Sequence, residues 1–256
     1  MSILLKSAQR IFFCFLIFFS FGTLVHAQVF SVPNKDETPT KTLFIPAKAP
    51  KAIVLLFPGG GGMLRLTDEG ATKNPHTFVR SKDMWSQYGI HAVLVDSPYD
   101  LGITRNSLRG TSDHMDRVAQ VVAFYKQKYD LPLWIFGHSM GSATVTNFSN
   151  RHKTQKAIVD GIIVAGTNAT AKLDEDVLFP TLAIHHRYDS CKHDPLSNSE
   201  KLINSRDSSI RKKLVILEGG SNDGDECQSL SYHGFYKIEE QFISEAANFI
   251  LRTKSD

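Results

Sequence analysis

The stretch that decides the fold is LPLWIFGHSMGSATVTNF, residues 131–148. Residues 131–136 (LPLWIF) form an apolar run typical of a buried strand, and residues 142–148 (SATVTNF) read as a helix. Between them lies GHSMG, residues 137–141, a tight turn with glycine two positions before and after Ser139. Small residues at those positions let strand and helix approach without collision. In this strand–turn–helix context the motif predicts that Ser139 is presented as a nucleophile.

Strand-like and helix-like segments alternate along the rest of the chain. This order predicts an α/β fold with a mostly parallel central sheet flanked by helices, in a single domain over residues 28–256. Ser112 is expected to cap one helix. We expect a polar entry segment at 31–40, strands at 41–46, 52–57, 91–95, 131–136, 157–165, 181–185 and 213–217, and helices at 77–88, 112–129, 142–148, 196–203 and 238–251.

Only residues 166–180 separate the strand after the Ser139 helix from the next strand. Proteins of this architecture often carry a cap inserted at this point. A segment of this length is too short for a separate cap domain. We therefore expect no large cap and an open site.

The first 27 residues have the layout of a secretory signal peptide. Lys6 and Arg10 precede an apolar stretch over 11–25, and Val25-His26-Ala27 resembles a cleavage site. The alternative is an uncleaved anchor, but the stretch is shorter than the roughly 18 residues needed to span a bilayer. We therefore expect a protein exported to the periplasm or outside the cell, with no stable membrane span after cleavage.

Charge and cysteine content fit an exported protein. Removing residues 1–27 lowers the formal charge from +3 to about +1 and leaves no basic cluster, so nucleic acid is not an expected partner. Cys14 leaves with the signal, and the remaining pair, Cys191 and Cys227, is a disulfide candidate. The sequence gives no indication of an oligomeric state.

A nucleophilic serine needs a histidine base that is oriented by a carboxylate. In this kind of fold the acid follows the serine in the chain and the histidine comes last. Asp189 lies just past the strand at 181–185, and His233 stands immediately before the closing helix. We therefore predict Ser139, His233 and Asp189 as the catalytic residues, with Asp174, Asp176 and Glu218 as competing acids.

An oxyanion hole requires backbone N–H donors beside the nucleophile. One predicted donor is Met140, the residue after the serine. The other is Gly60, with Gly61 as the alternative, in the PGGGGM loop over 58–63. No Lys-Ser/Thr follows these glycines, so the loop is a poor match to a nucleotide-binding loop. Three residues in loops after strands are candidates to line the substrate pocket, namely Met63, Leu64 and Tyr99.

These residues resemble the α/β-hydrolase superfamily over essentially the whole mature chain. Three segments, 57–62, 185–191 and 227–235, more narrowly resemble a group of exported bacterial serine hydrolases of the esterase and lipase type. In that group the acid and base stand at the positions of Asp189 and His233, and the cysteines that flank them pair. The resemblance implies the fold and the triad but not the substrate.

The expected function is hydrolysis of carboxylic esters through an acyl-enzyme intermediate on the serine. The expected partner is a small-molecule ester substrate, and this chemistry needs no metal and no organic cofactor. Peptidase or thioesterase activity with the same triad is the alternative. A non-catalytic binding protein of the same fold is a further alternative, but all three triad residue types are present.

Overall fold

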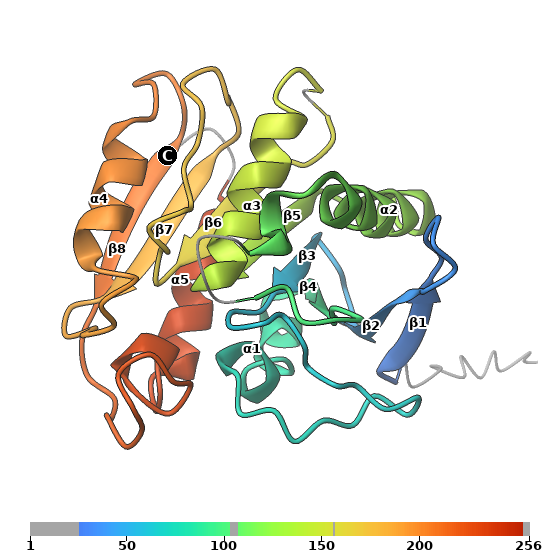
Figure 1. Ribbon diagram of the computed structural model, residues 1–256, viewed down its shortest axis with the longest axis horizontal. Helices are drawn as coiled ribbons and strands as arrows, with labels where there is room; N and C mark the ends of the chain where they lie inside the picture. The colour runs from blue at the N-terminus through green and yellow to red at the C-terminus, as the bar shows by residue number, and fades with distance from the viewer. Residues whose placement is uncertain (1–25, 103–106, 156, 253–256) are drawn as a thin grey trace, which may run out of the picture.

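The protein is described here by a computed structural model that covers residues 26–102, 107–155 and 157–252 (Figure 1). All but the last two residues of the predicted signal peptide lie outside the described residues. Within the described ranges, no helix combines the length and the apolar character required to cross a membrane.

The core of the molecule is an eight-stranded sheet in the order β1-β2-β4-β3-β5-β6-β7-β8. The first two strands in this order run antiparallel to their neighbours, and all later neighbours pair in parallel. The predicted mostly parallel sheet is therefore confirmed. The strands are β1 (Gln28–Val32), β2 (Thr40–Ile45), β3 (Ala52–Phe57), β4 (Ile90–Val95), β5 (Leu133–His138), β6 (Gly161–Ala165), β7 (Thr181–His186) and β8 (Lys212–Leu217).

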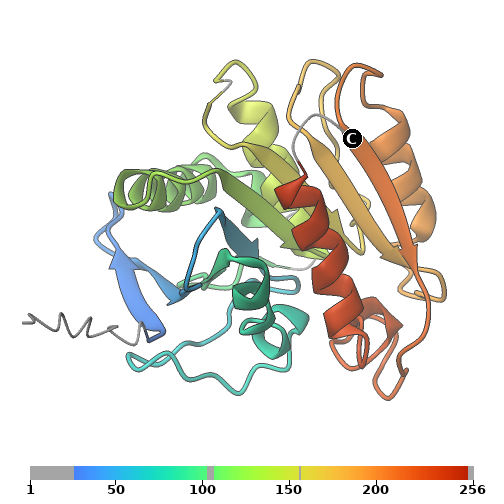
Figure 2. The same cartoon turned by 180° about the vertical axis from the view of Figure 1, so that it is seen from behind.

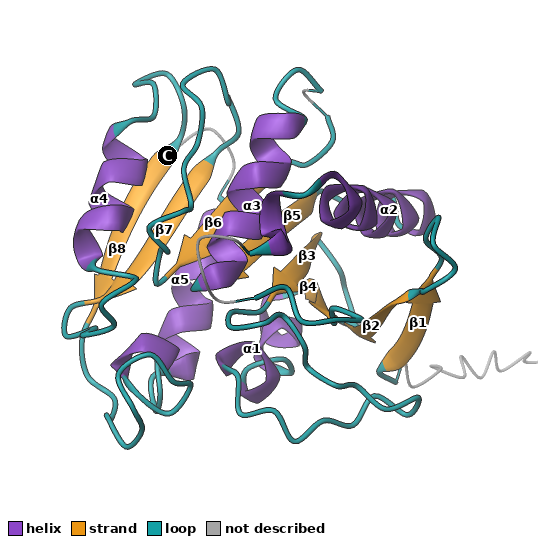
Figure 3. Cartoon of the chain, in the orientation of Figure 1, coloured by secondary structure: helices purple, strands orange, loops and turns teal. Residues whose placement is uncertain are grey.

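Helices cover both faces of the sheet, as Figures 1 and 3 show from one side and Figure 2 from the other. One apolar cluster joins the strands to α2 (Ser112–Lys128), α3 (Met140–Arg151) and α4 (Leu196–Asn204). A second cluster, on the opposite face, joins them to α1 (Thr77–Arg80), the 3₁₀ helix η1 (Met84–Tyr88) and α5 (Glu239–Leu251). Strands buried on both faces explain the continuous apolar runs in the sequence. Two further 3₁₀ turns are η2 (Leu108–Gly110) and η3 (Tyr232–Gly234).

Four local predictions need correction. The strand expected over 157–165 begins only at Gly161. The helix expected over 77–88 is broken into α1 and η1, because Ser81 turns its hydroxyl back onto the Thr77 carbonyl and ends the first helix. Thr111 rather than Ser112 caps α2, accepting the His114 N–H. The sequence analysis missed one strand, β1, which ends inside the expected entry segment and pairs with β2 at the edge of the sheet.

The fold brings two loops together at the carboxyl ends of the parallel strands. β4, which follows β3 in the chain, lies on one side of β3, and β5 lies on the other side. The strand order therefore reverses at β3. Phe57 at the end of β3 pairs with Gly137 near the end of β5. The crevice outside such a reversal point is where open α/β sheets bind ligands.

Candidate active site

Ser139 stands on a strained turn between β5 and α3. Its backbone has φ 53° and ψ −125°, a conformation that non-glycine residues rarely adopt. A Cβ on Gly137 would lie 2.2 Å from the Gly141 carbonyl oxygen, and one on Gly141 would lie 2.1 Å from the Phe57 carbonyl oxygen. Both glycines are therefore required sterically, and the turn holds the half-buried serine at the end of the sheet.

The glycine loop after β3 faces the serine with free amide groups. Gly60 has φ 53°, and a Cβ there would meet nothing within 4 Å. The N–H groups of Gly60 and Gly61 donate to no group within the described residues, and neither does the N–H of Met140 at the start of α3. The predicted oxyanion donors are thus unpaired, and Met140 lies beside the nucleophile in the chain.

Arg109 holds the glycine loop from behind. Its guanidinium is buried and donates to the carbonyl oxygens of Pro58 (3.1 Å) and Gly60 (2.7 Å), and to Thr144 Oγ1 (2.9 Å). Burial lowers the pKa of Arg109 to about 9, so the group stays protonated at neutral pH. Since a carbonyl and the following N–H point in opposite directions within one planar peptide, the contact with the Gly60 carbonyl directs the Gly61 N–H away from the arginine.

Asp189 and His233 form a buried pair. His233 Nδ1 donates to Asp189 Oδ2 at 2.8 Å, and the backbone N–H of Cys191 donates to the other carboxylate oxygen at 2.9 Å. Burial would raise the pKa of Asp189, but the hydrogen bond and charge of His233 bring it below its usual value. Burial would lower the pKa of His233, but the carboxylates of Asp189 and Asp194 raise it. The competing acids Asp174, Asp176 and Glu218 instead contact Lys153 or Arg187 on the surface.

A second carboxylate, Asp194, lies between the serine and the histidine. Ser139 Oγ donates to Asp194 Oδ2 at 2.8 Å, and His233 Nε2 lies 3.4 Å from the same oxygen. His233 Nε2 is buried and has no hydrogen-bond partner within the described residues. The serine hydroxyl and the imidazole nitrogen therefore both lie next to the same carboxylate oxygen, Asp194 Oδ2.

Two further histidines support the base from behind. His138 Nε2 donates to the His233 carbonyl oxygen at 2.8 Å, and His138 Nδ1 lies 3.1 Å from His76 Nε2. Burial, followed by the charge of His233, lowers the pKa of His138 to about 3. His138 is therefore neutral, and it fixes the backbone that carries the base without adding charge.

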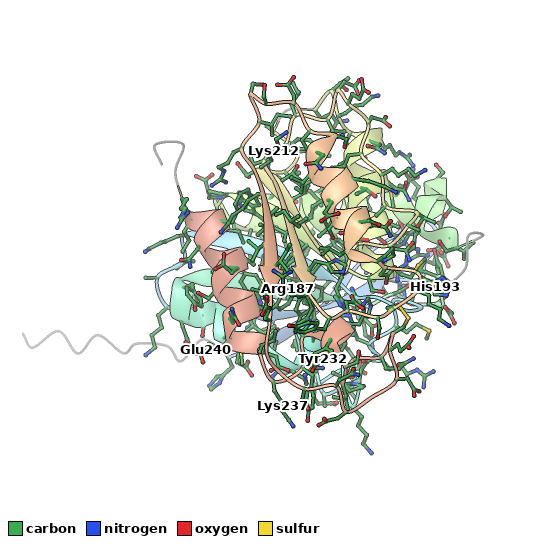
Figure 4. The ribbon with its side chains drawn as sticks, turned by 90° about the vertical axis from the view of Figure 1, so that its left-hand side faces the viewer. Arg187, His193, Lys212, Tyr232, Lys237 and Glu240 are labelled. Carbon is green, nitrogen blue, oxygen red and sulfur yellow. A yellow bond between two sulfur atoms is a disulfide. The ribbon has the colours of Figure 1, made fainter. Side chains whose placement is uncertain are left out.

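A disulfide between Cys191 and Cys227 links the acid loop to the base loop, with the two Cα atoms 4.7 Å apart. The predicted bridge is thus confirmed. Figure 4 views these loops from the side: Lys212, at the start of β8, lies at one end of the sheet, whereas Tyr232, next to the base, lies at the other. The bridge thus holds together two loops that are distant in sequence, at the carboxyl end of the sheet.

The site opens into a cavity of about 920 Å³. Ser139, His233 and Asp194 line it, together with the glycine loop and residues 63–65 and 71–76. Met63 and Leu64 therefore lie where a substrate pocket was predicted, although Leu64 is almost fully buried. Tyr99 does not line this cavity: its hydroxyl bonds with Asp113, and its ring packs under Arg117.

The side chains of Cys191, Asp194 and His233 cluster closely enough to suggest a metal site, with ligand atoms within 4.8 Å of one another. The sulfur of Cys191 is bonded to Cys227, however, so it cannot supply a thiolate. Two ligands remain, fewer than the three or four that protein zinc sites use. The donor set thus fits poorly to a metal.

Sequence reasoning missed Asp194, Arg109 and the supporting role of His138. Asp194 follows no strand directly, and Arg109 lies in the short turn η2 before α2. No motif spacing marks either residue, because both reach the site through the tertiary fold. The one available signal was the position of His138 inside the GHSMG turn.

Comparisons with solved structures identify the fold. A dienelactone hydrolase from Anabaena variabilis superimposes with a TM-score of 0.61 at 18% identity, over 89% of this chain and 98% of that one. A serine hydrolase without a lid from Xanthomonas campestris gives 0.59 at 13% identity (89% and 94%). A monoglyceride lipase from Saccharomyces cerevisiae gives 0.59 at 15% identity (89% and 94%). No family model and no curated protein matches the chain. The chain therefore has the α/β-hydrolase fold.

Proposed function

We propose that this protein is a serine hydrolase that cleaves carboxylic esters. The observation that carries the proposal is the buried Asp189–His233 pair, 2.8 Å apart, whose Nε2 lies 3.4 Å from Asp194 Oδ2, the oxygen that also accepts the hydroxyl of the strained Ser139. A serine, a base and an orienting carboxylate in this arrangement constitute the machinery of nucleophilic acyl transfer.

The reaction begins with the serine hydroxyl. It turns from Asp194 toward His233 Nε2, to which it transfers its proton as Oγ attacks the ester carbonyl carbon. Asp189 holds the resulting imidazolium through Nδ1. The imidazolium then protonates the departing alcohol, and water, activated by the same histidine, releases the acid from Ser139.

Backbone amides stabilise the negative charge that develops on the carbonyl oxygen. The N–H groups of Gly60 and Met140 are the proposed donors, with Gly61 as the alternative, and none of the three has another partner among the residues that the structure describes. Removal of one such donor typically costs about 10²–10³ in kcat.

Two observations support an ester over a peptide as substrate. Residues 166–180 between β6 and β7, all of them described, contain no helix or strand that could form a cap. The solved structures with this fold include a lidless serine hydrolase and a monoglyceride lipase, which is named for an ester substrate.

Export to an oxidising compartment is part of the proposal. The Cys191–Cys227 disulfide supports it, because such bonds persist mainly in secreted or periplasmic proteins. The layout of residues 1–27 supports a signal peptide.

The test is hydrolysis of p-nitrophenyl esters, from acetyl to palmitoyl, by the purified mature chain, with Ser139→Ala as control. We expect turnover that the variant lacks, and the optimal chain length then measures the acyl pocket. Turnover that persists in Ser139→Ala, or its absence on every ester, would reject the assignment. Thioesters and short peptides, assayed alongside, test the alternative reactions.

A further inference from the structure

Asp194 is a fixed carboxylate at the reacting centre that the proposed mechanism does not use. Its side chain is 1% exposed. Asn168 Nδ2 donates to Oδ1 at 2.6 Å, and the serine hydroxyl donates to Oδ2 at 2.8 Å. Asn168 is itself held by the backbone N–H and hydroxyl of Thr170. Asp194 is therefore built into the site rather than free to swing away.

The negative charge of Asp194 has no permanent counter-ion. No lysine or arginine pairs with it within the described ranges, and its one ionisable partner is His233, 3.4 Å away. Burying an anion without a cation is costly, and sites that retain such groups are commonly functional. Burial raises the pKa of Asp194, in keeping with this missing partner.

The counter-ion that His233 provides is transient. His233 becomes cationic only while it holds the serine proton, and in the resting site, where the base must be neutral, the Asp194 carboxylate beside it is uncompensated. A positive charge on the substrate, beside the scissile bond, would supply the missing cation when the substrate binds.

We infer that Asp194 is a specificity-determining residue that selects substrates with an ammonium group close to the scissile bond. This inference rests on the proposed function. Asp194 Oδ2 lies 2.8 Å from the nucleophilic oxygen, so an ammonium bonded to it stands only a few bonds from an acyl carbon attached to Ser139. The substrate class is thus amino-substituted esters rather than plain alkyl esters.

The experiment compares matched esters with the mature chain. On the acyl side, β-alanyl and butyryl p-nitrophenyl esters differ only in an ammonium in place of a methyl group. On the alcohol side, the acetyl esters of 2-aminoethanol and 1-propanol differ in the same way. The measured quantity is the kcat/KM ratio of charged to neutral ester in the wild type, divided by the same ratio in Asp194→Asn. This double ratio cancels the intrinsic reactivity of each ester.

We expect a double ratio of tenfold or more in at least one of the two pairs. The control is Asp100→Asn, which removes a different carboxylate of the same cavity and should leave the ratio within about twofold. A double ratio near one in both pairs, with both esters slowed equally, would overturn the inference and make Asp194 a positioning residue. Labelling of Ser139 by a fluorophosphonate distinguishes failure of this inference from failure of the proposed function. Protein that is labelled but shows no preference for the charged ester contradicts only the inference. Protein that is not labelled contradicts the proposed function as well.

Discussion

The imidazole of His233 lies between two carboxylates. Asp189 binds Nδ1 at 2.8 Å, and Asp194 lies 3.4 Å from Nε2. The nearby His138 is neutral and adds no opposing charge. At the scale of single residues, the protonation of this one ring decides when the proposed base can act.

The first prediction concerns pH. Burial alone would lower the pKa of His233, but the two carboxylates raise it above its ordinary value. The base is active only when neutral, so kcat/KM should fall as pH falls through this raised pKa. We expect the midpoint of the acid limb above about 6.5, the ordinary histidine value.

The measurement is the pH profile of kcat/KM on a neutral ester. In Asp194→Asn the midpoint should move to lower pH, because one of the two stabilising charges is lost. A wild-type midpoint at or below the ordinary histidine value would contradict the geometry described for this pair.

Some residues of the candidate site could be identified from the sequence, and others could not. Asp189 and His233 could be selected because each follows a strand in the order that the fold requires, and the structure brings them into contact. Asp194 could not, because a residue five positions after Asp189 reaches the serine only through the turn that Asp194 N–H forms with the Cys191 carbonyl. Tyr99 was misassigned to the pocket because proximity to a strand end does not fix the direction of a side chain.

Two elements converge at the serine, the turn between β5 and α3 and the glycine loop after β3. Their backbones touch at the Gly141–Phe57 contact. The loop carbonyls are held by Arg109, which lies just before α2. The positions of the amides therefore depend on contacts between elements as well as on the glycines themselves.

The second prediction tests the contact between the elements. In Gly141→Ala the new methyl would lie 2.1 Å from the backbone oxygen of Phe57, so strand and helix must separate. We expect a loss of about 1–3 kcal/mol in the free energy of unfolding, measured by urea denaturation. Gly224→Ala is the matched control, since its nearest neighbour would be 3.4 Å away. Equal stability of the two variants would contradict the packing described here.

The third prediction concerns Arg109 as a positioning residue. Arg109→Lys retains the charge but loses the planar fork that bridges the loop carbonyls and Thr144. We expect kcat to fall by about tenfold to a hundredfold with little change in KM, because the oxyanion donors act mainly in the transition state. Thr144→Val, which removes a single contact of the arginine, should have a smaller effect. A rise in KM at constant kcat would assign Arg109 to substrate binding instead.

At the scale of the whole molecule, the alternation of apolar strands and amphipathic helices was sufficient to predict the sheet and its parallel character. The β1 edge strand was missed, because its pairing with β2 depends on a neighbour rather than on its own short sequence. The break between α1 and η1 was also missed, since side-chain hydrogen bonds compete with the helix there.

The fourth prediction concerns the disulfide that joins the acid and base loops. The two cysteines are 36 residues apart, and closing a loop of this length restricts the unfolded chain. We expect the Cys191→Ser/Cys227→Ser double variant to lose about 2–4 kcal/mol of unfolding free energy, measured by denaturation without reductant. Its kcat should also fall, because Asp189 and His233 lie on the two loops concerned. Wild-type stability that does not change on addition of reductant would contradict this role.

The central claim is that Ser139 is a nucleophile activated by His233. The most direct test is incubation of the mature chain with a fluorophosphonate, followed by intact-mass and peptide mass spectrometry. We predict a single adduct on the peptide that contains Ser139, absent in Ser139→Ala and strongly slowed in His233→Ala. No adduct on the wild type, or an adduct that persists in Ser139→Ala, would contradict the claim.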